Sequence, residues 1–282
     1  MWKQKIIETK RGAFEIFECG EGEPLAVTHL YSEFDERGNA LAHPFTPYYH
    51  VFLINVRGAG HSVKAKNPQE YRMEETVADL EAIRESLGFE KWAFAGHSTG
   101  GMLGLKYAAI TPGSISKLIV GGAAASYEYA LHPDCMYHHK NKNYPRIMEI
   151  MEALNNPETS VEKRKNLSYE WALMSYCSEE KLKDALKKPN SGRTIGERLD
   201  FFRKVDYRDF DVREQLKHID LPSFIYAGRF DAQCPVQFGI EIAELLPHAE
   251  LTIFEKSNHF PFLEEAEAFK AFVVSTLHTT HS

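Results

Sequence analysis

The chain has 282 residues, of which 43% are hydrophobic and 26% charged, and this composition is globular rather than disordered, collagen-like or disulfide-stapled. Its net charge of -7 disfavours a nucleic-acid partner, because phosphate binding requires a basic surface. The sequence contains neither the ~18 apolar residues of a membrane helix nor the apolar core of a signal peptide, so we expect a cytoplasmic protein that binds no membrane.

Short β-rich runs recur along the chain and are separated by helix-like stretches too long for hairpin loops. Segment 5–18 alternates polar and apolar residues around Arg11-Gly12 and predicts an antiparallel hairpin at a sheet edge. Further strands are expected at residues 25–29, 51–57, 91–96, 117–122, 223–228 and 250–255. Helical spacing predicts connecting helices at residues 73–87, 99–110 and 266–277. The alternation indicates an α/β fold, a mostly parallel, doubly wound sheet with helices on both faces.

In the middle of the chain the alternation stops, and helical pieces follow one another. They are expected at residues 145–154, 160–177, 179–187 and 194–205. Such a run inside an α/β pattern indicates an inserted helical cap over the carboxyl ends of the strands, where open sheets bind ligands. We therefore expect a core of residues 1–126 and 219–282 and a cap of residues 127–218.

The most informative segment is a G-x-S-x-G motif, formed by Gly96, Ser98 and Gly100, which follows a predicted strand and leads directly into a predicted helix. The small residues allow strand and helix to approach closely while the serine occupies a strained turn. We therefore predict that Ser98 is a nucleophile rather than part of a merely structural turn. The amide of Thr99 would then face the oxyanion, aided by the positive end of the helix.

A serine hydroxyl needs a base, and after this motif the partners follow in the order serine, acid, histidine. Strand 223–228 is followed by Asp231, and strand 250–255 is followed by a polar loop that carries His259. Because the carboxyl ends of parallel strands meet at one edge, Ser98, Asp231 and His259 are expected to converge as nucleophile, orienting acid and general base. Rival aspartates precede the strand: Asp206, Asp209, Asp211 and Asp220.

This layout resembles the α/β-hydrolase superfamily over essentially the whole chain. The resemblance implies a second oxyanion donor after the third strand, where the family's His-Gly pair and donating residue correspond to His29, Leu30 and Tyr31. Tyr31 would donate its amide, although Leu30 replaces the family glycine. The run from Asn55 to Ser62 is similar to the family's Asp-x-Arg-Gly-x-Gly-x-Ser segment, with Asn55 at the aspartate, and this match concerns the fold.

Within the superfamily, the chain looks most like capped bacterial hydrolases of the carboxylesterase and proline-iminopeptidase-like branch. Proline iminopeptidases typically carry His-Gly-Gly-Pro-Gly at the oxyanion loop and Gly-Gly-Ser-Trp-Gly at the elbow, and this chain departs from both patterns. Those peptidases also hold the substrate's free amine with cap carboxylates. Glutamates are available for that role, although solvation explains most of them: Glu128, Glu149, Glu152 and Glu170.

The predicted triad implies a serine hydrolase that cleaves carboxylic esters of small to medium apolar substrates through an acyl-enzyme, without a cofactor. Cap aromatics, including Tyr127 and Trp171, would bind an apolar acyl or alcohol group, or would pack within the cap. An aminopeptidase acting on N-terminal proline could use the same triad, and a small-molecule receptor without turnover could retain it. The natural substrate and the oligomeric state stay open.

The cysteines and histidines indicate neither a disulfide framework nor a metal site. The four cysteines are far apart and form no C-x-x-C pair. His138 and His139 are adjacent, but adjacent residues of a helix do not face one another, and no cysteine or carboxylate completes a ligand set nearby. We therefore expect reduced thiols and no bound metal.

Overall fold

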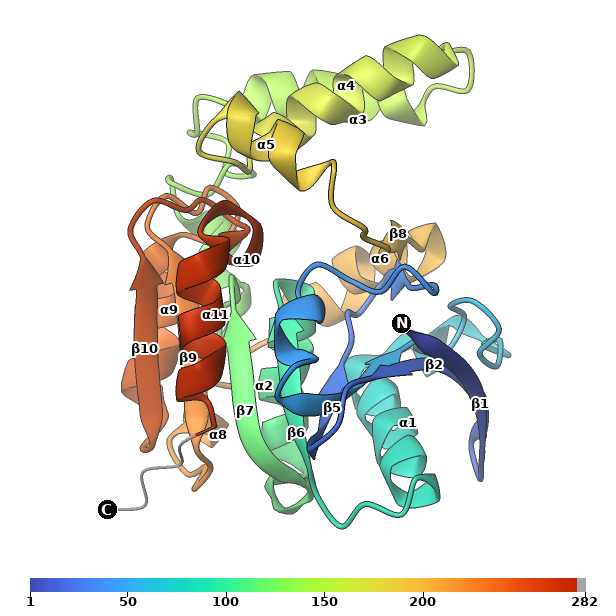
Figure 1. The fold of residues 1–282 in the computed structure, drawn as a ribbon. Helices are drawn as coiled ribbons and strands as arrows, with labels where there is room; N and C mark the ends of the chain where they lie inside the picture. Colours follow the sequence, from blue (N-terminus) through green and yellow to red (C-terminus); the bar gives the residue numbers. More distant parts are fainter. Residues whose placement is uncertain (278–282) are drawn as a thin grey trace.

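A computed structural model describes residues 1–277 of the chain. Within them, an eight-stranded sheet has the order β1-β2-β5-β3-β6-β7-β9-β10, and its last six strands are parallel (Figure 1). The strands are β1 (Lys3–Thr9), β2 (Gly12–Cys19), β3 (Glu23–Val27), β5 (Tyr49–Ile54), β6 (Trp92–His97), β7 (Ile115–Gly121), β9 (Ser223–Gly228) and β10 (Ala249–Phe254). The mostly parallel, doubly wound sheet that the sequence predicts is therefore confirmed.

The predicted hairpin forms the N-terminal edge of this sheet. β1 and β2 pair antiparallel, from Lys3 opposite Glu18 to Thr9 opposite Gly12. Gly12 has a φ of 124°, a conformation that favours glycine, and the Thr9 hydroxyl donates to its carbonyl at 2.8 Å. β2 then pairs antiparallel with β5, which joins the hairpin to the parallel strands.

The core consists of two large apolar clusters, one on each face of the sheet. β6 shows the separation, because Trp92 and Phe94 belong to one cluster whereas Ala93 and Ala95 belong to the other. Burial on both faces explains why these strands are apolar almost throughout. The first cluster includes residues of α1 (Met73–Ser86), α2 (Thr99–Ile110) and α9 (Val236–Leu245), and the second includes residues of α10 (Pro261–Glu264) and α11 (Ala266–Ser275).

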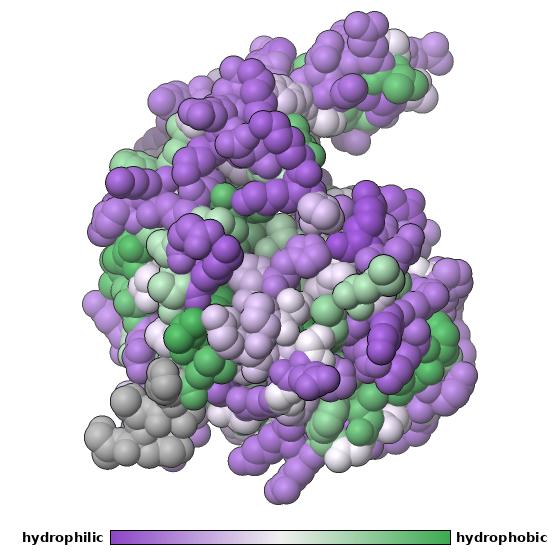
Figure 2. Space-filling model, viewed as in Figure 1, coloured by the Kyte–Doolittle hydropathy of each residue, from purple (hydrophilic) through white to green (hydrophobic). Residues whose placement is uncertain are grey.

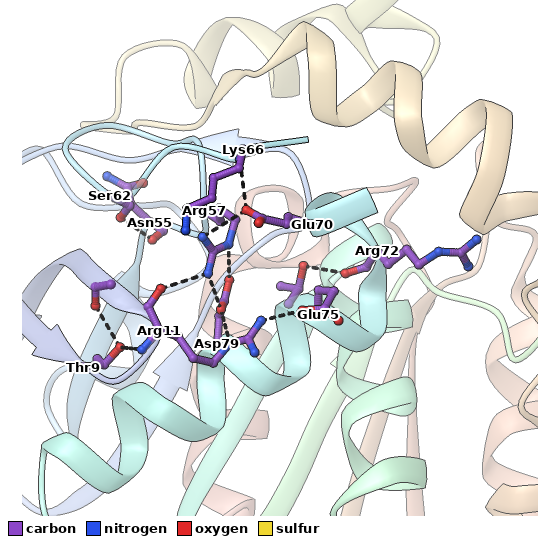
Figure 3. A network of polar contacts seen from close by, with 12 residues as sticks. Thr9, Arg11, Asn55, Arg57, Ser62, Lys66, Glu70, Arg72, Glu75 and Asp79 are labelled. Atoms are coloured by element: carbon purple, nitrogen blue, oxygen red, sulfur yellow. Dashed lines mark hydrogen bonds and ion pairs between the residues drawn. The ribbon is translucent and has the colours of Figure 1, made fainter. Parts of the chain in front are cut away.

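A polar network attaches α1 to the hairpin turn and to the loop after β5 (Figure 3). Asp79 on α1 accepts from Arg57 Nε at 2.9 Å, from Arg57 Nη2 at 2.8 Å and from Arg11 Nε at 2.6 Å. Arg57 and Asp79 are both buried, so each compensates the desolvation of the other. At the start of the same segment, Asn55 accepts a hydrogen bond from the Phe34 amide at 2.7 Å. These contacts give the segment that resembles the family motif a structural role.

Between β7 and β9 the chain forms a run of helices with one short strand. Its elements are η4 (Tyr127–Leu131), α3 (Tyr144–Asn155), α4 (Val161–Leu173), α5 (Glu179–Ala185), β8 (Arg193–Thr194), α6 (Gly196–Phe201), the π-helical turn η5 (Phe202–Asp206), α7 (Tyr207–Asp209) and α8 (Arg213–Leu216). In Figure 1, α3, α4 and α5 lie above the carboxyl ends of the parallel strands. No helix within residues 1–277 is long and apolar enough to cross a bilayer.

The helix predicted over residues 194–205 is wrong at its first residue, which the structure places in a strand, and its end is irregular. β8 pairs antiparallel with β4 (Ser32–Glu33), so the chain enters α6 from a strand. The helix then widens into the π-helical turn η5. The pairing joins segments that are far apart in the sequence, and local helical spacing carries no signal for such a contact.

Candidate active site

Ser98 stands at the turn between β6 and α2. Its φ of 56° is the only positive φ of a non-glycine residue within residues 1–277, and strain of this kind persists where the surrounding structure enforces it, most often at functional sites. A methyl group on Gly96 would lie 2.2 Å from the Gly100 oxygen, and one on Gly100 would lie 2.6 Å from the Thr28 oxygen. The Ser98 amide donates to the Gly121 carbonyl at 2.9 Å, which ties the turn to β7. The close approach of β6 and α2 therefore explains Gly96, and the close approach of α2 to the chain after β3 explains Gly100.

Asp231 and His259 form a buried pair, with exposed fractions of 4% and 2%. His259 Nδ1 lies 2.8 Å from Oδ2 and 3.0 Å from Oδ1 of Asp231. The Oδ1 atom also accepts from the amides of Gln233 and Cys234, each at 2.9 Å. Because a carboxylate only accepts, Nδ1 of His259 carries the proton, and its Nε2 is free to accept another.

The structure brings the three predicted triad residues to one end of the sheet. Ser98 follows β6, Asp231 follows β9 and His259 follows β10. In the described part of the chain no hydrogen bond joins the Ser98 hydroxyl to His259, although both residues line the same two cavities. Catalytic hydrogen bonds are often long before a substrate binds. Three rival aspartates have other partners: Asp206 accepts from the Met73 amide, Asp211 pairs with Arg213, and Asp220 pairs with His248.

The two cavities beside Ser98 have volumes of about 340 Å³ and about 400 Å³. The first is mainly apolar, and its lining includes Met102, Tyr129, Tyr137, Ile147, Met151 and Phe202. The second is more polar, and its lining includes His29, Ser32, Asn39, Asn190, Thr194 and Gln233. Figure 2 shows the surface hollowed between the helices α3 to α5 and the body of the molecule. A substrate whose scissile bond lies at Ser98 therefore has room for one part in each cavity.

Two backbone amides predicted to bind an oxyanion come from the elements that border this turn. Thr99 begins α2, and the first amides of a helix have no acceptor within it. The Tyr31 amide lies 3.4 Å from His29 Nδ1, which makes a long and weak hydrogen bond. His29 Nε2 lies 2.9 Å from Thr99 Oγ1, so the imidazole lies between the Tyr31 amide and the Thr99 side chain. Both Thr99 and Tyr31 line the first cavity together with Ser98.

His29 gives the folded chain a specific pH dependence. Burial, together with positive charge on His259 and Arg198, lowers the pKa of His29 from 6.5 to about 3. Between these values the unfolded chain binds a proton that the folded chain does not bind. With respect to His29, the free energy of unfolding is therefore highest above pH 6.5. It decreases progressively as the pH falls toward 3.

We expect His29→Gln to flatten the decline of the free energy of unfolding below pH 6.5, by up to about 1.4 kcal/mol per pH unit. Urea unfolding at a series of pH values measures this slope for the wild type and the variant. His218→Gln is the control, because His218 is exposed. Identical slopes for the wild type and His29→Gln would contradict the buried, neutral state of His29.

The two aromatic residues predicted to bind substrate lie outside the linings of both cavities. The Tyr127 carbonyl accepts from the Tyr207 hydroxyl at 3.0 Å, and Trp171 lies on α4. The first cavity is lined instead by one face of α3, with Tyr144, Ile147, Met148 and Met151. These residues follow the i, i+3, i+4, i+7 spacing of a helix face, so the periodicity of the sequence carried the signal for them.

The fold and this arrangement of residues define the class of protein. Residues 28–266 match the alpha/beta hydrolase fold family, and the chain belongs to that family. A solved alpha/beta fold family hydrolase from Bacillus anthracis str. Sterne is 58% identical, with a TM-score of 0.96 over 98% of this chain and 99% of that chain.

Two functionally named relatives are more distant. A proline iminopeptidase from Heyndrickxia coagulans is 24% identical over 97% of this chain and 98% of its own length. A pimeloyl-[acyl-carrier protein] methyl ester esterase from Vibrio atlanticus is 24% identical over 91% of this chain and 95% of its own length. The predicted superfamily is thus confirmed, and its relatives include esterases as well as iminopeptidases.

Proposed function

We propose that the protein is a serine hydrolase that cleaves carboxylic esters of small to medium apolar substrates. The observation that carries this proposal is the coincidence of a strained serine with a buried Asp231–His259 pair at shared cavities. A structural turn alone does not explain why Ser98 keeps a strained backbone beside an imidazole whose Nε2 is free. Together these features are the parts that an activated nucleophile requires.

The proposed mechanism is a two-step acyl transfer. Ser98 Oγ attacks the ester carbonyl while His259 Nε2 takes its proton, and the resulting imidazolium is stabilised by Asp231. His259 then protonates the alcohol, which leaves as the acyl-enzyme forms. Water, deprotonated by His259, attacks the acyl-enzyme and releases the acid and the free serine. No cofactor enters this sequence of steps.

The oxyanion of each tetrahedral intermediate is held by the amides of Thr99 and Tyr31. The first amide benefits from the positive end of α2, and the second comes from the loop after β3. Preorganised donors of this kind stabilise charge that exists only in the transition state and the intermediate. They therefore raise kcat rather than ground-state affinity.

We further infer that residues 127–218 act as a cap on a core of residues 1–126 and 219–282. The inserted segment supplies most of the apolar lining of the first cavity, including Tyr129, Tyr137 and the lining face of α3. An apolar cavity of this size suits an acyl or alcohol group of modest length.

The charge of the two cavities favours an ester over a peptide with a free amino terminus. Within residues 1–277, no aspartate or glutamate lines either cavity. Three of the cap glutamates that could hold an amine are paired elsewhere, Glu128 with Arg213, and Glu149 and Glu170 with Arg146. A buried ammonium without a carboxylate partner is strongly unfavourable. The lining of the two cavities thus supports an ester substrate over one with a free amine.

A pair of substrates that differ only in the amine tests this distinction. We expect the wild type to hydrolyse N-acetylproline benzyl ester with a kcat/KM at least about tenfold higher than that for proline benzyl ester, because the acetyl group removes an ammonium that would lack a partner. Steady-state kinetics with both esters measure the ratio. Preference for the free amine, or greater efficiency on proline p-nitroanilide than on a p-nitrophenyl ester, would support the aminopeptidase alternative.

A further inference from the structure

Arg198 is a buried cation whose hydrogen bonds go to neutral oxygens. Its exposed fraction is 1%, and within residues 1–277 no carboxylate oxygen lies within ion-pair distance of it. Nε donates to the Leu30 carbonyl, Nη1 to the Arg57 carbonyl at 2.9 Å, and Nη2 to the Thr76 hydroxyl at 2.8 Å. Burial lowers the pKa of Arg198 to about 10, so the guanidinium is charged at neutral pH.

The Leu30 carbonyl belongs to the same planar peptide unit as the Tyr31 amide. In a trans peptide the carbonyl and the amide point in opposite directions, so a donor that holds the carbonyl also fixes the direction of the N–H. A charged donor on the carbonyl oxygen also polarises the unit, which strengthens the hydrogen bond that the amide can give. Arg198 therefore acts on the amide that the proposed mechanism uses.

The segment that carries Arg198, residues 193–198, also contacts the loop at the Tyr31 carbonyl and beyond. The Ile195 amide donates to the Tyr31 carbonyl at 2.8 Å. β8 then pairs with β4, with Ser32 opposite Thr194. Residues 193–198 thus contact the peptide units before and after Tyr31 as well as the strand that follows. Leu30, which stands where the family has glycine, is itself buried in the apolar core.

We propose that Arg198 is a positioning residue, which orients and polarises the Leu30–Tyr31 peptide unit so that the Tyr31 amide binds the oxyanion. The inserted helices then contribute to turnover as well as to substrate binding. This inference rests on the proposed function, because it requires that an oxyanion form at Ser98. A merely structural role for Arg198, attaching α6 to the core, would change stability and leave the turnover of folded molecules unchanged.

The test compares Arg198→Met and Arg198→Lys with the wild type in p-nitrophenyl butyrate hydrolysis and in inhibition by an alkyl trifluoromethyl ketone, whose adduct with serine carries an oxyanion. Arg193→Met is the matched control, because Arg193 lies on β8, just before α6, but pairs with the Glu33 side chain at 2.8 Å, not with a peptide carbonyl. The thermal unfolding midpoint of each variant shows whether that variant is folded at the temperature of the assay.

For Arg198→Met we expect kcat and kcat/KM to fall together by about 10- to 100-fold, and trifluoromethyl ketone affinity to fall by a similar factor. Arg198→Lys, which keeps a buried cation, should lose about threefold to tenfold, and it carries the test if the methionine variant does not fold. Arg193→Met should stay within about twofold of the wild type.

Folded Arg198 variants with unchanged kcat, or with a loss confined to KM, would overturn the positioning role. A wild type that hydrolyses no ester and binds no trifluoromethyl ketone would instead overturn the proposed function. The two failures are therefore distinguishable.

Discussion

Ser98→Ala is expected to lower kcat/KM for p-nitrophenyl butyrate by at least about 10⁴-fold, leaving the slow turnover that the oxyanion donors alone support. The reason is chemical, because the variant has no oxygen that can form the acyl-enzyme. The backbone of the turn is retained, since alanine is also a non-glycine residue and the surrounding contacts that enforce the φ of 56° are unchanged. The thermal unfolding midpoint should therefore stay close to that of the wild type.

Ser116→Ala is the control for this substitution. Ser116 lies on β7 and donates to Glu23 at 2.6 Å, and it lines neither cavity. Its removal should leave kcat/KM within about twofold of the wild type. Ester hydrolysis by folded Ser98→Ala at a rate near that of the wild type would show that another group carries the chemistry.

Asp231→Asn should be almost as damaging, with a loss of about 10⁴-fold in kcat. The structure fixes how the asparagine would sit, because the amides of Gln233 and Cys234 both donate to Oδ1 and so require an oxygen there. The new NH2 group would then face His259 Nδ1 as a donor. The imidazole would have to carry its proton on Nε2, where it can no longer accept one from Ser98.

The chain offers a matched aspartate–histidine pair away from the cavities. Asp220 lies 3.0 Å from His248, and both side chains are exposed. Asp220→Asn should leave kcat within about twofold, because an exposed pair contributes little to stability and this one touches no reacting group. Steady-state kinetics of the two variants, at matched folded fraction, measure the contrast. Asp231→Asn with kcat near the wild-type value would remove Asp231 from the mechanism.

Much of the fold could be predicted because its signals are local. The apolar runs that became β6 and β7 are continuous since both faces of those strands are buried, and the helix face of α1 repeats at regular spacing. The G-x-S-x-G motif also predicts the position of Ser98 from local sequence, because Gly96 avoids a clash with the Gly100 carbonyl across the turn, whereas Gly100 makes room for the Thr28 carbonyl, which is distant in the sequence. Chain order and strand ends then pointed to Asp231 and His259.

The contacts made by the inserted segment could not be predicted from local sequence signals. The pairing of β8 with β4 and the hydrogen bond from Arg198 to the Leu30 carbonyl both join residues that are far apart in the sequence. Residue type alone predicts Tyr127 and Trp171 as substrate contacts, but which aromatic side chains line the cavities depends on how the helices pack. A buried arginine that bonds to backbone carbonyls has no sequence signature, because its partners are main-chain atoms common to every residue.

An activated nucleophile at Ser98 should react covalently with an electrophilic probe. The wild-type protein would be incubated with a fluorophosphonate, and the adduct located by intact mass and peptide mapping. We predict one adduct per chain, on Ser98, formed more slowly in the presence of an ester substrate and in Asp231→Asn. No adduct on the folded protein, or an adduct on another residue, would show that Ser98 is not an activated nucleophile. Binding of small molecules without any turnover would then indicate a receptor built on the hydrolase fold.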